Sequence, residues 1–218
     1  TDCVLVERDE LTSGSTWHAA GNVPTFSGDR NVMRLQHYGT ELYTRLAADP
    51  AHPIAYHKTG SIRLAQTAER LREFHHVAAM ANALGFGYEI LDLAEMKARH
   101  PLLEDHDLAG ALWDPSDGDI DPSQLTQALA SAARAWGATV HRFTRVTALE
   151  RTVSGEWEVT TDKGTIRCEY VVNAGGYRGA EVAALGGRFL PLVTMEHQYL
   201  VTEPVPELAA MDSKVPLV

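Results

Sequence analysis

Short apolar runs and regularly spaced apolar positions divide the first part of the chain into strands and helices. The run at residues 3–6 predicts a short buried strand that ends in Glu7. Asp29 is a typical helix-capping residue, and the apolar positions after it predict a helix that reaches about Ala48. Steps of three and four residues place these positions on one helix face, made of Val32, Leu35, Tyr38, Leu42 and Leu46.

Capping and turn residues mark most of the remaining elements. Thr67 begins a long helix that Gly85 and Gly87 end, and Pro122 begins a helix that Gly137 ends. Residues 115–121, rich in Asp, Gly and Pro, are expected to form a polar loop. Further strands are expected at 61–65, 88–92, 108–114, 138–143, 145–152, 155–162, 164–172 and 191–203, and further helices at 12–20, 93–100 and 179–185.

Helices and strands alternate along the chain, which is typical of an α/β or mixed α+β fold. A cluster of antiparallel-looking strands at about residues 145–170 interrupts the alternation. No single linker divides the chain cleanly. We therefore expect two domains joined by crossing segments rather than two consecutive ones.

Composition and charge exclude several classes of function. The net charge of −10 and the pI of about 5.4 argue against a nucleic-acid partner or an anionic membrane, since both require a concentrated basic face. No apolar run approaches the about 20 residues that span a membrane, and no signal peptide is visible. Cys3 and Cys168 stand far apart in strand-like runs, so we expect buried free thiols in a reducing compartment.

The apolar strand that ends in Glu7 is how a dinucleotide-binding fold presents a carboxylate to an adenosine ribose. A Gly-rich phosphate turn should precede such an acid by about 20 residues. Because only six residues precede Glu7, either this interpretation is wrong or the chain is the shortened piece of a larger one. A second candidate is the passage from the apolar residues at 170–172 through Ala174, Gly175 and Gly176 into a helix, where backbone amides can approach an anion closely. An ordinary strand-to-helix turn remains an equal alternative.

His18 stands among small residues and has three possible roles: a metal ligand, a packed structural residue or a cofactor contact. No other histidine has a spacing that suits a shared metal site, since His75 and His76 are adjacent and point to different helix faces. Hydroxyls and amides near the start of the expected helix favour a cofactor contact; they belong to Ser13, Gly14, Ser15 and Thr16. His197 and Tyr199 share one face of the expected last strand, where they could exchange protons with a ligand or simply be half-buried.

Four segments occur in an order that resembles one family. They are "LVERDELTSGSTWHAAG", "DGDIDPSQLTQALASAARAWGA", "VVNAGGYRGAEVAALGG" and "PLVTMEHQYLVTE". The chain is similar to FAD-dependent oxidoreductases of the D-amino-acid-oxidase superfamily, and most similar to the dimethylglycine and sarcosine dehydrogenase branch. The resemblance implies a partial Rossmann-like FAD-binding domain at residues 1–50 and 114–187, interwoven with a partial substrate-binding domain at 51–113 and 188–218.

The resemblance also implies roles for single residues. Glu7 would hold the FAD adenosine ribose, the backbone of Val146 would contact adenine, and His18 would be joined covalently to the 8α carbon of the flavin. His197 would face the substrate as a catalytic residue, whereas Tyr199 does not match the catalytic Tyr of this family, which lies further downstream. The other expected cofactor-binding residues are Ser15, Thr16, Ala174, Gly175 and Gly176, where relatives usually have Ala at the position of Gly175. No metal is implied.

The implied activity is flavin-dependent oxidative demethylation of an N-methyl amine such as dimethylglycine or sarcosine, with formaldehyde or a folate-bound carbon as the second product. Folate would bind through a C-terminal region that this chain lacks. As an internal fragment without the Gly-rich phosphate turn, the chain is expected not to retain FAD tightly. The alternatives are another oxidoreductase of the superfamily, acting on glycerol 3-phosphate or an amino acid, and a catalytically silent scaffold. The expected compartment is the cytoplasm, or the mitochondrial matrix for an animal protein.

Overall fold

The computed structural model describes residues 2–218 and forms two compact units. The first unit consists of residues 2–19 and 126–199, and the second of residues 20–125 and 200–218. The chain therefore crosses between the units more than once, as expected for a mixed α/β chain with interwoven parts. The edges of the units do not coincide with the expected domain boundaries, and the assignment of FAD-binding and substrate-binding domains stays a prediction.

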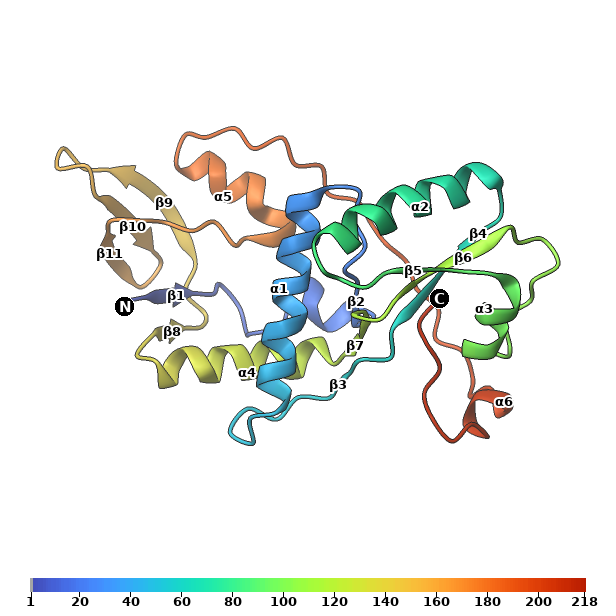
Figure 1. Ribbon diagram of the computed structural model, residues 1–218. Helices are drawn as coiled ribbons and strands as arrows, with labels where there is room; N and C mark the ends of the chain where they lie inside the picture. The colour runs from blue at the N-terminus through green and yellow to red at the C-terminus, as the bar shows by residue number, and fades with distance from the viewer. Residues whose placement is uncertain (1) are drawn as a thin grey trace. The chain divides into compact units, whose positions relative to one another are not determined.

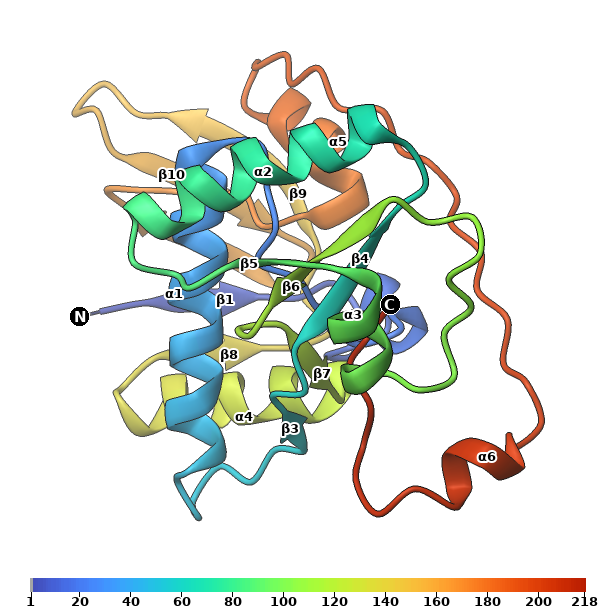
Figure 2. The same cartoon turned by 45° about the vertical axis from the view of Figure 1, so that its right-hand side comes forward.

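The centre of the second unit is an antiparallel sheet in the order β4–β6–β5 (Figure 2). Its strands are β4 (Ser61–Ala65), β6 (Gly110–Asp114) and β5 (Glu89–Leu91). Leu112 faces α2 (Ala68–Ala83), while the neighbouring Ala111 packs with residues of α3 (Leu93–Arg99). Because successive side chains of a strand point to opposite faces, both faces of this sheet are covered.

The helix α2 shows how closely local sequence signals match this unit. The side chain of Thr67 accepts a hydrogen bond from the Arg70 amide, and Gly85 adopts a φ of +87° just beyond the helix. The apolar stripe of the helix is buried against the sheet and consists of Phe74, Val77, Ala78 and Ala81. The cap and the stop thus agree with the prediction.

A second sheet in this unit has the order β2–β7–β3, and part of it was not expected. Its strands are β2 (Asn22–Val23), β7 (Gly118–Ile120) and β3 (Tyr56–His57). The prediction of a polar loop over 115–121 was therefore wrong for β7, because pairing with two neighbouring strands outweighs the turn-forming composition of this segment. A short helix, α6 (Pro206–Ala209), lies near the end of the chain (Figure 1).

The helix α1 (Arg30–Ala47) begins where expected, with the Asp29 side chain accepting hydrogen bonds from the amides of Asn31 and Val32. The apolar face that the spacing indicates is nevertheless largely exposed: Val32 is 45%, Leu35 70% and Tyr38 56% exposed. The buried residues are Met33, His37, Thr40 and Leu46. On this buried face Met33 packs in the apolar core, and the ring of His37 stacks on Phe86 with ring centroids 3.4 Å apart.

The first unit contains a two-stranded parallel sheet, in which β1 (Val4–Val6) pairs with β8 (Thr139–His141). Three antiparallel strands follow β8, in the expected order: β9 (Val146–Arg151), β10 (Trp157–Thr161) and β11 (Gly164–Cys168). The helix α5 (Gly179–Leu185) packs on β9. The helix α4 (Pro122–Ala135) leads into β8.

Several expectations for the strands and cysteines of this part of the chain were wrong. The strand β1 is not buried, since Val4 is 41% and Leu5 46% exposed, and Cys3 is exposed while Cys168 is only partly buried. Beyond β11, the expected strand does not continue to Val172, and residues 191–203 form no strand. Apolar composition alone does not make a strand, because its amides and carbonyls need a neighbouring strand, and in the described part of the chain none pairs with these segments.

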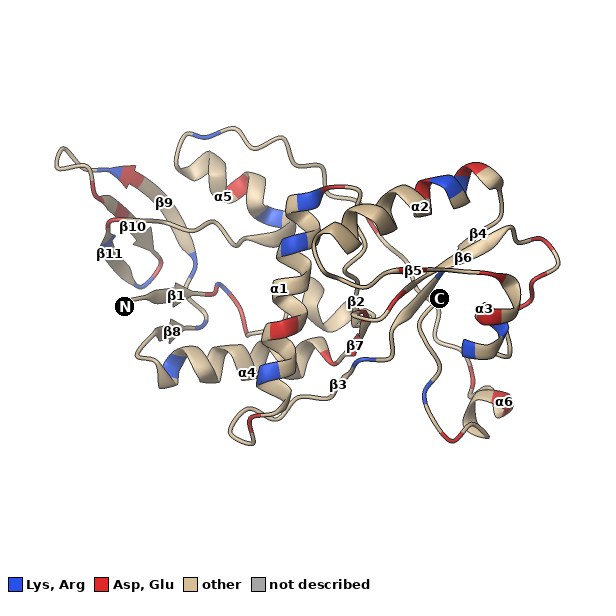
Figure 3. Cartoon of the chain, in the orientation of Figure 1, with Lys and Arg blue, Asp and Glu red and all other residues tan. Residues whose placement is uncertain are grey.

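Charged residues of both signs are interspersed along the helices and strands of both units (Figure 3). Among residues 2–218, no helix has the length and apolar character needed to cross a membrane.

Candidate functional site

The acid that ends β1 lies at the carboxyl ends of two parallel strands. The Glu7 amide donates to the His141 carbonyl at 2.8 Å, and the Glu7 carbonyl accepts from the Thr144 amide at 2.7 Å. The Glu7 side chain is partly buried and accepts a hydrogen bond from the Asp9 amide at 2.9 Å. In open α/β sheets ligands bind outside the carboxyl ends of parallel strands, so this position fits a carboxylate that receives ribose hydroxyls.

The segment after β8 brings Val146 to the same region as Glu7. Val146 follows Thr144 by two residues and begins β9, and the Phe143 amide donates to the Asp9 carbonyl at 3.0 Å. An ion pair between Arg142 and Glu10, 2.7 Å apart, further ties the loop after β1 to this segment. The hydrogen bond from Arg142 lowers the pKa of the Glu10 carboxyl, so the pair stays charged at neutral pH. Two predicted adenosine contacts thus lie on adjoining segments.

His18 ends a single 3-10 turn, η1 (Ser15–His18), rather than the expected longer helix. The turn has no side-chain cap, and Thr12 before it adopts a φ of +73°, which is uncommon for a residue with a side chain. The His18 side chain is exposed and its ring lies against that of Trp17, with centroids 3.7 Å apart. This contact leaves the imidazole exposed, so His18 is not a packed core residue.

The small residues 174–176 form a turn that Asn173 holds in place. The Asn173 side chain accepts from the Gly175 amide at 3.1 Å and donates to the Gly179 carbonyl at 2.8 Å. Gly176 has a φ of +56°, a conformation that favours glycine. At Gly175 a Cβ would lie 3.0 Å from the Val182 side chain, so an Ala would be crowded here. The turn is therefore shaped by its own asparagine and glycines.

Tyr177 connects three predicted segments, and sequence reasoning missed it. A Cβ placed on Gly14 would lie 3.9 Å from the Tyr177 ring, so the loop before His18 lies beside the turn at 174–176. The Tyr177 carbonyl also accepts a hydrogen bond from the Thr194 hydroxyl at 3.0 Å. An aromatic residue directly after a Gly–Gly pair is the signal that could have drawn attention to it.

His197 is not brought to this group by the contacts of the structure. It is exposed in a segment without secondary structure, and Tyr199 is 59% exposed in the same segment. Because this segment is not a strand, the two side chains have no common strand face. The segment's link to the other predicted residues is the Thr194 hydrogen bond, three residues before His197.

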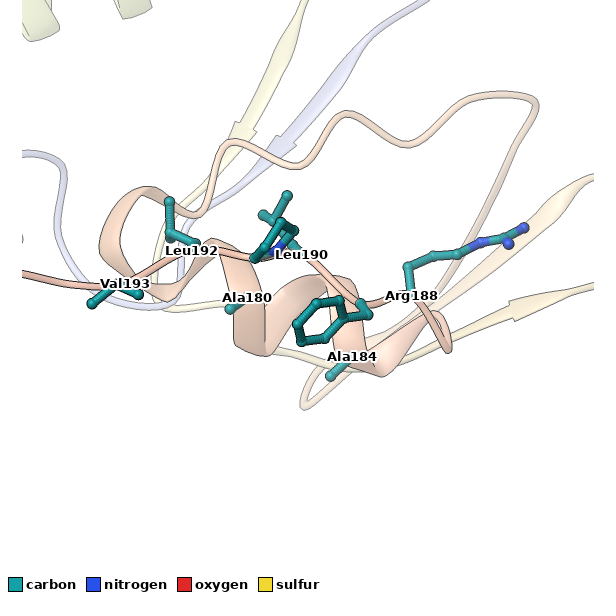
Figure 4. A pocket seen from close by; sticks show the side chains of 8 residues that line it. Ala180, Ala184, Arg188, Leu190, Leu192 and Val193 are labelled. Atoms are coloured by element: carbon teal, nitrogen blue, oxygen red, sulfur yellow. The ribbon is translucent and has the colours of Figure 1, made fainter.

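Two further features of the described residues bear on ligands. No group of three or more His, Cys, Asp or Glu side chains among residues 2–218 is arranged to hold a metal ion. An apolar groove of about 380 Å³ lies along α5 and contains Arg188, but none of the predicted site residues (Figure 4). Its other lining residues are Ala180, Ala184, Phe189, Leu190, Pro191, Leu192 and Val193.

Comparison with known families gives one match that covers nearly the whole chain. Residues 1–217 match the family DAO, described as FAD dependent oxidoreductase. The structure resembles the crystal structure of L-proline dehydrogenase from P. horikoshii with a TM-score of 0.78, at 26% identity, over 85% of this chain and 49% of that one.

Three curated relatives illustrate the range of proteins to which this sequence is similar. The chain is 37% identical to dimethylglycine dehydrogenase, mitochondrial, of Rattus norvegicus, over 99% of the chain and 25% of the relative. It is 34% identical to human sarcosine dehydrogenase, mitochondrial, over 93% and 23%. It is also 35% identical to the mouse pyruvate dehydrogenase phosphatase regulatory subunit, mitochondrial, over 93% and 23%. The chain thus spans about a quarter of the length of these relatives.

Proposed function

The chain belongs to the DAO family of FAD-dependent oxidoreductases, and on this basis we propose that the complete protein oxidises the N-methyl group of an amino acid such as dimethylglycine or sarcosine. The observation that carries the proposal is the 37% identity to dimethylglycine dehydrogenase over 99% of the chain. The sarcosine dehydrogenase match points to the same class of substrate. Because the chain covers about a quarter of these relatives, the activity is proposed for the whole protein.

The first unit would hold the adenosine half of FAD. Glu7 would accept the ribose hydroxyls, and the backbone of Val146 would contact adenine; the hydrogen bonds between their segments support a common site. Ser15 and Thr16 would offer hydroxyls to the cofactor. The turn at 174–176 would approach it closely, because Gly176 has no side chain to stand in the way and Tyr177 keeps the turn beside Gly14.

Two histidines would take part in the chemistry. FAD, when bound, supplies the acceptor for the two electrons that leave the N-methyl carbon. His18, exposed and in contact with Trp17, would provide the covalent link to the cofactor. A neutral His197 would accept the amine proton, which frees the nitrogen lone pair before oxidation. Water would then add to the oxidised methyl carbon, releasing formaldehyde and the demethylated amine.

The substrate proposal is tested on the complete protein loaded with FAD and kept free of oxygen. Dimethylglycine or sarcosine should bleach the visible flavin band, whereas glycerol 3-phosphate and ordinary amino acids should leave it unchanged. Bleaching by glycerol 3-phosphate or an unmethylated amino acid alone would instead assign the protein to another activity within the family. Formaldehyde measured before air is admitted should match the amount of flavin reduced.

A second candidate is a flavin-free regulatory scaffold, and the similarity to a phosphatase regulatory subunit favours it. That protein's name describes regulation rather than oxidation. A complete protein that purifies without flavin and takes up none from added FAD would support the scaffold and contradict the oxidase proposal.

The compartment and the folate partner follow from the same relatives. All three curated relatives are named mitochondrial, so we propose the mitochondrial matrix for an animal protein and the cytoplasm for a bacterial one. Folate, if it receives the methyl carbon, would bind outside residues 1–218.

A further inference from the structure

The second unit contains two fully buried acids that the proposed function does not use. Asp114 ends β6 and Asp117 precedes β7, and both are 0% exposed. The nearest cation is Arg63, whose Nη2 lies 3.4 Å from Asp117 Oδ2 and whose side chain is 31% exposed. Two buried negative charges against one partly solvated guanidinium would be costly, because the interior stabilises unpaired charge poorly.

Thr25 lies between the two carboxyl groups and contacts both. Its amide donates to Asp117 Oδ1 at 2.6 Å. Its hydroxyl oxygen is 2.5 Å from Asp114 Oδ2, 3.0 Å from Asp117 Oδ1 and 3.0 Å from the Tyr88 hydroxyl. Thr25 is itself 0% exposed, so water does not supply missing partners from the surface. The hydroxyl is therefore the centre of a closed polar cluster.

Two ionised carboxylates would lie close together here, because each has an oxygen within hydrogen-bond distance of the one Thr25 hydroxyl. The amide of Ser116 donates to Asp114 Oδ1 at 2.8 Å, and such neutral donors leave both negative charges in place. One proton added to the pair removes this repulsion. Asp117 also accepts from the Ser61 hydroxyl at 2.6 Å, which favours the ionised form of this carboxyl.

The surroundings of the pair favour retention of this proton. Burial, and next the charge of Asp114, raise the pKa of Asp117 to about 6. The two carboxyl groups are joined through one hydroxyl, so the proton belongs to the pair. The titratable and charged groups that face it come from α1, β3, β4 and the segment before β5: His37, Tyr56, Arg63 and Tyr88. Burial lowers the pKa of His37, so this nearest histidine does not replace the missing proton at neutral pH.

We propose that Asp114 and Asp117 share one proton in the folded protein and together clamp Thr25, which fixes the Thr25–Phe26 segment to the turn between β6 and β7. The clamp also seats Phe26, whose ring lies under the Arg63 guanidinium at 4.5 Å and against Phe74 with centroids 5.9 Å apart. Thr25 therefore belongs to the polar cluster of the second unit, and the next residue, Phe26, packs on its apolar core.

The shared proton predicts a definite pH dependence. A carboxyl group whose pKa is higher in the folded than in the unfolded protein stabilises the fold below its unfolded pKa, and this stabilisation is lost as the pH rises through the folded value. Between about pH 4 and pH 7 the folding equilibrium constant of the wild type should fall by a factor on the order of one hundred from this pair. His37 acts with the opposite sign in part of this range, so the pair is measured as a difference between variants.

The test compares the wild type with Asp114→Asn and with Asp107→Asn, a matched change of an exposed acid. The side-chain amide introduced by Asp114→Asn can donate to the Thr25 hydroxyl without a titrating proton. Chemical unfolding should therefore show that Asp114→Asn gains stability relative to the wild type as the pH rises from about 4 to about 7, while Asp107→Asn runs parallel to the wild type. If the difference in stability between Asp114→Asn and the wild type does not change with pH, the proposal of a shared proton is wrong.

Carbon-13 NMR of the aspartate carboxyls gives the same answer without a variant that must fold. In the wild type one carboxyl of the pair should titrate well above the ordinary range, and ordinary titration of every aspartate would overturn the proposal.

Hydrogen exchange tests whether the two acids fix the Thr25–Phe26 segment. Thr25→Val should increase amide exchange over residues 25–27, whereas Thr25→Ser, which keeps the hydroxyl, should not; equal exchange in both variants would contradict the clamp.

Discussion

The two compact units differ in where they place apolar and functional side chains. In the second unit the core residues Ile62, Phe74 and Leu112 are 0% exposed. In the first unit the strand residue Leu5 is 46% exposed and Val172 is 86% exposed. All residues predicted to contact FAD or substrate belong to the first unit, whereas the buried acid pair belongs to the second.

The second unit thus buries residues that stabilise the fold, whereas the first unit exposes residues that are proposed to bind a ligand. Packing in the second unit stabilises the chain through area removed from water, whereas the exposed apolar strand and turns of the first unit contribute little by that route. Regions with few buried contacts are also those from which ligand-binding segments are drawn. Variants that make the same chemical change in both units test this comparison.

The largest expected difference comes from removing one leucine side chain from each unit. Leu112→Ala should lower the free energy of unfolding by about 2–5 kcal/mol, because it leaves a cavity between β6 and α2. Leu5→Ala should cost less than about 1 kcal/mol, since its side chain is already half solvated. Chemical unfolding of both variants checks this, and equal losses would remove the contrast between the units.

Two asparagines that hold turns provide a second matched pair. Asn82 donates to the Tyr88 carbonyl at 2.9 Å and accepts from the Tyr88 amide at 2.8 Å, in a partly buried setting. Asn82→Ala should cost about 1–3 kcal/mol, because backbone groups of Tyr88 lose their partners.

Asn173→Ala removes the analogous pair of bonds in the first unit, where the side chain holds Gly175 and Gly179. Because solvent reaches this turn, stability should fall by less than about 1 kcal/mol. Its effect should appear instead in FAD affinity of the complete protein, measured by titration with FAD. A large loss of stability with unchanged affinity would show that the turn serves the fold.

The smallest expected effect concerns His37, which is buried against Phe86. Burial lowers its pKa, so its contribution to stability is present above its unfolded pKa and is lost as the pH falls through the folded value. His37→Gln should therefore weaken the loss of stability on acidification, by about 1 kcal/mol or less. His75→Gln, the same change at an exposed residue of α2, should leave the pH profile unchanged; unfolding midpoints at several pH values decide between the two.

Sequence predicted those elements whose boundaries depend on local chemistry. The strand Ser61–Ala65 and the helix Gly179–Leu185 match the prediction at both ends, and Asp29 and Thr67 cap their helices as expected. These boundaries depend on backbone dihedrals and caps within a few residues.

Features that depend on distant partners were not predicted. The strand β7 forms because β2 and β3 lie beside it, and the buried face of α1 packs against distant residues such as Phe86 and does not follow its own apolar spacing. The acid pair depends on Thr25, which lies 92 residues before Asp117 in the sequence and contacts it only in the folded chain. The predicted cofactor residues came from the order of four motifs, and their roles remain predictions.

The most direct test of the proposed function is whether flavin stays on the polypeptide after denaturation. The complete protein is denatured in acid and washed, and the flavin fluorescence of the polypeptide is measured for the wild type, His18→Ala and His75→Ala. We expect the wild type and His75→Ala to keep the flavin and His18→Ala to lose it. Flavin that stays attached to His18→Ala, or a wild type that holds none in any form, would contradict the assignment.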